Sequence, residues 1–144
     1  MVIAVTLRLE ELFHQGKDFK WERPLCCPKC KGKLWSHGFR SRLFQGFPSV
    51  LYLKRYQCQS CEAIIQLGPS GFWLRLQSSI QEIFEVLRYR LSTRFWPPGI
   101  SRQRAGHWLR GFHKLFLMNP QWQVPGQGMV QALEVVAASG LRFV

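Results

Sequence analysis

Two short cysteine motifs, Cys27-Pro28-Lys29-Cys30 and Cys58-Gln59-Ser60-Cys61, decide the fold of the first half of this 144-residue chain. Each motif places two thiols on one tight turn, so that both sulfurs point at a common centre. Two such turns supply the four thiolates of a closed tetrahedral Zn²⁺ site. The spacing therefore predicts one structural zinc ion on Cys27, Cys30, Cys58 and Cys61, because a site with four protein ligands has no open position for catalysis.

The cysteine pattern has two other interpretations. A CxxC pair is also a redox motif, but redox pairs of the thioredoxin type lie at a strand-to-helix junction, and two copies flanking a basic hairpin do not fit that setting. Disulfide bonds need an oxidising compartment, and the first residues lack the basic start of a signal peptide. We therefore expect a cytoplasmic protein. Cys26 is either a small buried apolar side chain or a substitute for Cys27 in the site.

The amount and the placement of charge favour a polyanionic partner. The formal net charge is +12, and no acidic residue lies between Glu22 and Glu62 or within residues 86–133. Nucleic acid suits such segments, because Lys and Arg contacts to phosphates release bound counterions. The alternatives are a merely solvated basic surface and an acidic membrane surface. No apolar run approaches the ~20 residues of a membrane span, so we expect no membrane-spanning segment.

The first 67 residues indicate a lead-in, residues 1–23, followed by the zinc ribbon, residues 24–67. Apolar residues in the lead-in have helical spacing at first, and β-rich runs flank the second cysteine pair. The expected elements are a helix from about Leu7 to Gly16, a strand at Phe19 and Trp21, strands at 50–57 and 63–67, and a turn at Gly46–Pro48.

Gly68-Pro69-Ser70-Gly71 separates the ribbon from a helical region, which we place at residues 68–118. Beyond this boundary the apolar period changes from two to 3.6 residues. Pro97-Pro98-Gly99 divides the region into two helices, and a C-terminal apolar helix follows in the tail, residues 119–144. The fold class is therefore α+β. The expected helices are 80–91, capped by Ser78 or Ser79, 102–116, capped by Ser101, and 128–138.

The second of these helices has the pattern of a recognition helix. Its apolar stripe leaves arginine and glutamine side chains on the opposite face, where they suit the base edges of a major groove. An ordinary amphipathic helix with a solvated basic face has the same periodicity. The residues expected to contact nucleic acid are Arg102, Gln103, Gly106 and Arg110, and the stripe contains Ala105, Trp108, Leu109 and Phe112.

The hairpin between the cysteine pairs supplies a second candidate surface. Arg40, Arg42, Lys54 and Arg55 are expected to line one ridge and to contact phosphates.

The sequence shows no group of residues that could form an active site. The single aspartate and seven glutamates are scattered, whereas two-metal phosphoryl transfer needs convergent carboxylates. The chain contains no Walker loop, nucleophile elbow or H-E-x-x-H motif. We therefore expect no enzymatic activity.

Three stretches together resemble a known family. Cys27-Pro28-x-Cys30, Trp35-Ser36-His37-Gly38-Phe39-Arg40-Ser41-Arg42 and Arg55-Tyr56-x-Cys58-x-x-Cys61 are similar to the zinc ribbon at the N-terminus of insertion-sequence transposases and of related small mobile-element proteins. The run from Ile100 to Arg110 resembles the recognition helix of their helix-turn-helix. The resemblance implies binding to element-end DNA. It departs at Lys31 and Glu62, where the family usually has glycine. The residues up to Val144 leave no room for the family's acidic catalytic domain, so we expect a binding module, an accessory regulator or a remnant.

These observations favour a zinc-dependent protein that binds double-stranded DNA, as a transposase-type binding module or as an accessory or regulatory protein. The alternative is a zinc-ribbon interaction module that docks on a larger nucleic-acid machine, such as a transposase, a polymerase or a CRISPR-type effector. A third interpretation is binding of RNA or single strands through the basic hairpin. Each of these is compatible with a homodimer.

Overall fold

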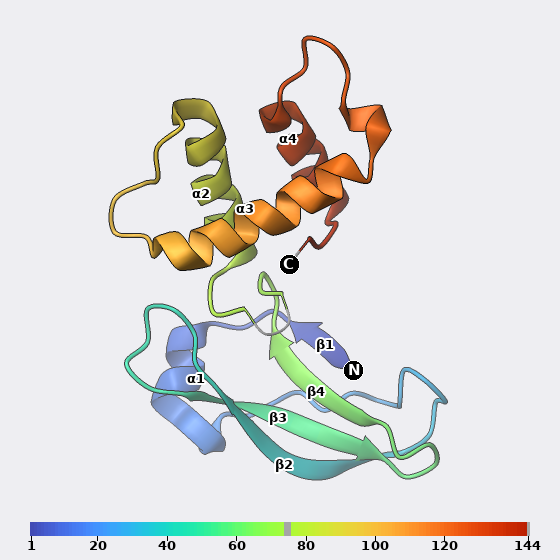
Figure 1. Ribbon diagram of the computed structural model, residues 1–144. Helices are drawn as coiled ribbons and strands as arrows, with labels where there is room; N and C mark the ends of the chain where they lie inside the picture. The colour runs from blue at the N-terminus through green and yellow to red at the C-terminus, as the bar shows by residue number, and fades with distance from the viewer. Residues whose placement is uncertain (74–75, 144) are drawn as a thin grey trace. The chain divides into compact units, whose positions relative to one another are not determined.

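The computed structural model describes residues 1–73 and 76–143, and it has the α+β class that the sequence predicts (Figure 1). The chain divides into two compact units, Met1–Ser78 and Ser79–Val144. Among the described residues, the first is built on a four-stranded sheet with one α-helix, and the second contains three α-helices. The lead-in belongs to the sheet unit. The boundary between the units follows Ser78 in the chain, whereas the sequence placed it at residues 68–71.

The sheet has the strand order β1-β4-β3-β2. The three later strands pair antiparallel around the second cysteine pair, and the last two lie close to the strands that the sequence predicts at 50–57 and 63–67. The first strand was not predicted, because four residues carry little periodicity; it forms by pairing in parallel with β4 at the edge of the sheet. The strands are β1 Val2–Val5, β2 Leu34–Arg42, β3 Leu51–Cys58 and β4 Ile64–Pro69.

The lead-in forms the expected helix but not the expected strand. The helix α1 spans Leu9–Gln15 and is followed by a 3₁₀ turn, η1, at Gly16–Asp18. The strand expected at Phe19 and Trp21 is wrong, because these residues are irregular in the structure. Their rings pack edge to face with centroids 5.2 Å apart and line the apolar clusters. Burial of two aromatic rings therefore fixes this segment without strand pairing.

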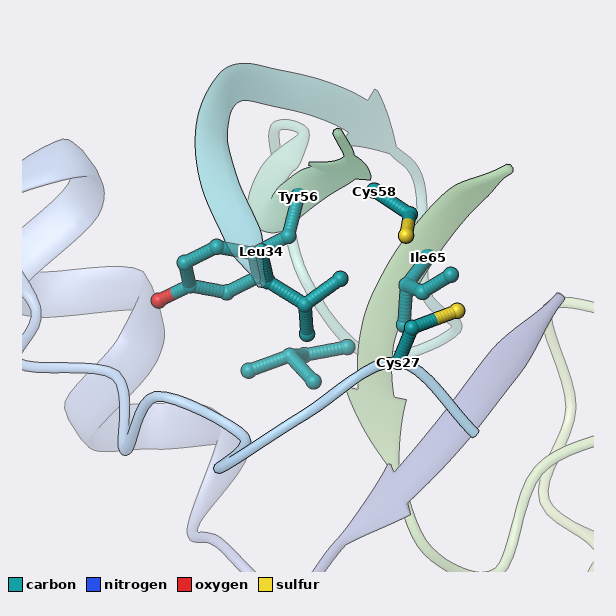
Figure 2. Close-up of a cluster of buried hydrophobic side chains, with 6 residues drawn as sticks. Cys27, Leu34, Tyr56, Cys58 and Ile65 are labelled. Carbon is teal, nitrogen blue, oxygen red and sulfur yellow. The ribbon is translucent and has the colours of Figure 1, made fainter. Parts of the chain in front are cut away.

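The strand β3 contributes to two apolar clusters with opposite faces. Leu51 and Leu53 are buried in a cluster with Leu12 of α1, whereas Tyr56 and Cys58 are buried in a second cluster. Side chains alternate between the faces of a strand, so the buried face changes along β3 between Leu53 and Tyr56. The second cluster, drawn in Figure 2, contains Cys27, Leu34, Tyr56, Cys58, Ile65 and Leu67.

The helical unit contains α2 Ile80–Thr93, α3 Arg102–Leu117 and α4 Met129–Ser139. A short 3₁₀ turn, η2, at Pro120–Trp122 lies between α3 and α4. Both predicted caps are confirmed: the hydroxyl of Ser79 accepts the Glu82 N–H at 3.1 Å, and that of Ser101 accepts the Arg104 N–H at 3.4 Å. Apolar side chains from all three helices are buried, among them Ile83, Leu87, Trp108, Phe112, Leu133 and Val136.

A two-pronged ion pair joins the first and last helices of this unit. The guanidinium of Arg88 on α2 donates to both carboxylate oxygens of Glu134 on α4, at 2.6 Å and 3.0 Å. This pairing lowers the pKa of Glu134 and raises that of Arg88. Both side chains are exposed, so water screens the pair and its contribution to stability is small. The apolar stripes therefore carry most of the packing between these helices.

Candidate metal centre and basic surfaces

The two cysteine turns have the same backbone hydrogen bonds. In the first, the Lys31 N–H donates to the Cys27 carbonyl at 2.8 Å, and the Cys27 N–H donates to the Gly32 carbonyl at 2.9 Å. In the second, Glu62 donates to Cys58, and Cys58 donates to the residue after Glu62, each at 3.0 Å. Two equivalent turns therefore present their sulfurs in the same way.

The four sulfurs of Cys27, Cys30, Cys58 and Cys61 all lie within 4.8 Å of one another. The sulfurs of Cys27 and Cys61 are 3.8 Å apart, and those of Cys30 and Cys58 are 3.3 Å apart. A tetrahedral ion with metal–sulfur bonds of about 2.3 Å places its sulfurs about 3.8 Å apart. The four cysteines therefore form one site that can hold a metal ion. Cys26 is half-buried and lies outside this group.

The site is joined directly to the apolar core of the sheet unit. Cys27 and Cys58 are buried, whereas Cys30 is exposed. Figure 2 shows the sulfurs of Cys27 and Cys58 at one end of the cluster, with Ile65 beside them and Tyr56 at the other end. Ligands that are also core residues couple metal binding to folding.

Backbone N–H groups and neighbouring sulfurs set the acidity of the thiols. The N–H of Cys61 stabilises the Cys58 thiolate and, with the Cys30 thiol, lowers the pKa of Cys58 to about 6. The N–H of Gly32 favours the Cys30 thiolate, but hydrogen bonding to the sulfurs of Cys58 and Cys61 raises the pKa of Cys30 to about 12. Without a metal, the Cys58 thiol is therefore more acidic than the Cys30 thiol. A cation is needed to hold all four thiolates together.

Lys31 and Glu62 follow the second cysteine of each turn, and both have left-handed backbones. Their φ angles are 64° and 56°. Glycine adopts this conformation without strain, whereas other residues do so at a cost of about 1–2 kcal/mol. The structure thus keeps the conformation of a glycine-containing turn with residues that are strained in it. Lys31 and Glu62, in place of the glycines of the resembling family, therefore add backbone strain, and the hydrogen bonds of both turns still form.

Gly32 allows the two turns to approach each other. A Cβ atom at this position would lie 2.5 Å from the Ser60 hydroxyl oxygen and 3.1 Å from the Cys58 sulfur. Sequence reasoning missed this role, although Gly32 directly follows Lys31, the position where the resembling family usually has glycine. Any side chain here would push the second turn away from the first.

The predicted phosphate contacts on the hairpin do not share one environment. Arg40 is exposed on β2. Arg42 is half-buried: its guanidinium donates to the carbonyls of Trp73 and Leu76 and lies 4.7 Å from the centre of the Phe44 ring. Burial, together with the charge of Arg40, lowers the pKa of Arg42. Arg42 is therefore used within the fold, where it holds Trp73 and Leu76 near β2.

Lys54 and Arg55 lie on opposite faces of the sheet, because they are adjacent on β3. The ammonium of Lys54 lies 4.4 Å from the centre of the Phe39 ring, across the strand pair. Among the described residues, the Nε atom of Arg55 is buried and has no hydrogen-bond partner. The single ridge of charge that the sequence predicted is wrong, because strand alternation divides these residues between two faces. Phosphate contact stays a prediction for Arg40, Lys54 and Arg55.

The predicted contact residues of α3 lie on one side of that helix. Arg102, Gln103 and Arg110 are exposed, and Gly106 between them is half-buried. The buried side chains of the helix are Ala105, Trp108 and Phe112. The face that α3 turns away from its core is basic, and α3 contains no acidic residue. These residues belong to the helical unit, and the hairpin belongs to the sheet unit.

Comparisons with family models, with curated proteins and with solved structures found no match for this chain. Within the described part of the chain, no helix has both the length and the apolar character that crossing a membrane requires.

Proposed function

We propose that this chain is a zinc-dependent protein that binds double-stranded DNA through its helical unit. The choice of zinc is supported by the ligands, because four thiolates at tetrahedral spacing suit Zn²⁺ and leave no open coordination position. Such a metal is structural. It would hold the two cysteine turns together and keep the sheet unit folded.

The observation that carries the proposal is the exposed face of α3. Arg102 and Gln103 lie in its first turn, and Arg110 follows two turns later on the outer side. Arginine pairs with guanine and glutamine with adenine in a major groove. In this proposal α2 and α3 form a helix-turn-helix-like pair, with α3 as the reading helix. Arg40 and Arg55 of the sheet unit would contact phosphates, in the manner of a mobile-element binding or accessory protein.

Sequence-specific binding can be tested with Arg102→Ala. A selected duplex and a random duplex of equal length are titrated with each protein at fixed salt. We expect the change to cost about 1–3 kcal/mol on the selected duplex and much less on the random one, because a base contact is lost. Arg8→Ala is the matched control, since Arg8 is an exposed arginine in the other unit. Equal losses on both duplexes, or no preference by the wild type, would contradict the assignment of α3.

A second candidate function is an interaction module that docks on a larger nucleic-acid machine. It is favoured by Leu117 and Met118, which are each 69% exposed at the end of α3, and by Phe95, which is 73% exposed. A contiguous exposed apolar patch marks a surface that binds proteins, and Leu117 and Met118 are neighbours in the chain. If the wild type shows no duplex binding and co-purifies with a protein partner, this function takes the place of DNA reading.

A further inference from the structure

We propose that the exposed sheet face beside the cysteine cluster, where β2 begins and β3 ends, binds an unpaired nucleobase of single-stranded nucleic acid, with Trp35 as the stacking platform. This inference deepens the proposed nucleic-acid function and rests on it. It adds a ligand class, the single strand, and a site in the sheet unit that is separate from α3.

The register of the sheet places three side chains in one row. Trp35 of β2 pairs with Gln57 of β3, and Gln57 pairs with Ile64 of β4. Directly paired residues on neighbouring strands point to the same face and lie about 5 Å apart. Trp35 is 60% exposed and Ile64 is 43% exposed. The row therefore forms an open aromatic, amide and aliphatic surface, on the face opposite to the buried Cys58.

Trp35 is held in place although it is exposed. Its indole N–H donates to the side-chain oxygen of Gln59 at 3.2 Å, which joins the ring to the second cysteine turn. An exposed tryptophan that is already oriented loses little side-chain freedom when a ligand stacks on it. A structural explanation for the ring is weak, because most of its surface packs against nothing in the sheet unit.

A hollow of about 360 Å³ lies beside the ring and has the chemistry of a base site. It is lined by Trp35, Gln57, Cys58, Gln59 and Glu62. Any base can stack on an indole ring, and base stacking on aromatic side chains is how single strands are held without strong sequence preference. The amide groups can donate to and accept from a base edge. The Glu62 carboxylate can accept from an exocyclic amino group, as found on cytosine.

The charges around the hollow suit the sugar-phosphate backbone. Glu62 is the only acidic residue from Arg23 to Gln81. Arg55 lies on the same face as Gln57, one row further along β3, and its buried Nε has no partner among the described residues. With a base in the hollow, the negatively charged phosphate of the same nucleotide would lie near the positively charged guanidinium of Arg55. An acidic protein segment would instead bring its carboxylates towards Glu62, which argues against a protein ligand here.

The test uses the full chain, loaded with zinc, and three fluorescein-labelled probes. These are a single-stranded DNA of about ten nucleotides, the same strand with abasic sites, and a duplex, all at one salt concentration. We expect Trp35→Ala to weaken binding of the single strand by roughly 5- to 100-fold, because base stacking is lost. Trp35→Phe should lose less. Tyr89→Ala is the control, since it removes a 43% exposed ring from the helical unit and should leave single-strand binding unchanged.

The abasic strand separates stacking from phosphate contact. The wild type should bind it as weakly as Trp35→Ala binds the intact strand, and the mutation should then cause no further loss. Equal affinity of wild type and Trp35→Ala for the intact strand overturns the inference, as does undiminished binding of the abasic strand. If that happens while duplex binding persists, the proposed function of α3 stands. If the wild type binds no nucleic acid at all, both proposals fail. Zinc content and thermal unfolding of Trp35→Ala confirm that the fold is retained.

Discussion

At the scale of single residues, the metal centre shows how one backbone conformation is kept without its usual residue. Lys31 and Glu62 have positive φ angles, and both turns still form the same pair of hydrogen bonds. The hydrogen bonds of the turn therefore do not require glycine after the second cysteine. Because folding and metal binding are linked, strain in these turns would reduce the apparent affinity for a metal held by the four cysteines.

Replacing Lys31 with glycine should stabilise the metal-bound fold. Left-handed backbone is free of steric strain in glycine, so we expect a gain of up to about 1 kcal/mol, reduced by the greater freedom of glycine in the unfolded chain. Glu62→Gly should act in the same direction. Denaturant unfolding with zinc present measures both changes. Lys33→Gly, outside the turn, is the control and should not stabilise. Loss of stability in Lys31→Gly and Glu62→Gly would show that their side chains, and not their backbones, matter.

At the scale of elements, helices were predictable and strand pairing less so. The helices α2 and α3 follow from apolar period and serine caps, and α4 follows from its apolar period alone, because both signals are local. The parallel pairing of β1 with β4 joins residues more than sixty positions apart, and no local pattern specifies such a partner. The change of buried face along β3 depends on where α1 and the first cysteine turn pack. The irregular Phe19–Trp21 segment is fixed by ring packing in the same way.

The candidate site was predictable to a similar degree. Cysteine spacing identified the four sulfurs that cluster, because each turn is local and the metal needs all four. The basic residues of the hairpin were grouped by composition alone, and composition does not tell which face a side chain occupies. Arg42 shows the consequence, because its guanidinium holds backbone carbonyls of the fold. Sequence alone makes Trp35 one of several tryptophans that could stack on the bases of a single strand, and its register and exposure single it out from the others.

The helix α3 depends on Trp108 for its packing. This residue is 1% exposed and is among the largest fully buried side chains. Trp108→Ala should destabilise the helical unit by about 3–5 kcal/mol, since a large cavity is left in a small core. Hydrogen exchange of amides in α2, α3 and α4 measures the loss. Trp35→Ala is the matched control and should leave these amides protected. Unchanged protection in Trp108→Ala would mean that other side chains fill the cavity.

At the scale of the whole molecule, the two units depend on different sources of stability. The sheet unit has two small apolar clusters, and one of them contains two of the four candidate metal ligands. The helical unit contains no cysteine and is held by apolar stripes and serine caps. A unit with so little apolar burial needs an additional staple. The metal should therefore matter to the first unit and not to the second.

Removal of the metal should unfold the sheet unit and spare the helices. With a chelator at neutral pH, we expect amides of β2, β3 and β4 to lose protection from hydrogen exchange, because Cys27 and Cys58 are core residues as well as ligands. Amides of α2 and α3 should stay protected.

Acid should act like the chelator, because protons compete with the metal for the thiolates. The pKa of Cys58 without metal is about 6, so below that pH even this thiol takes up a proton, and the metal affinity falls further as the pH is lowered. Cys58→Ser should reproduce the loss at every pH, and Cys26→Ser, outside the cluster, should not. Protection of the strands in chelator, with metal absent by elemental analysis, would show that the sheet unit folds without the ion and that the cysteine cluster has another purpose.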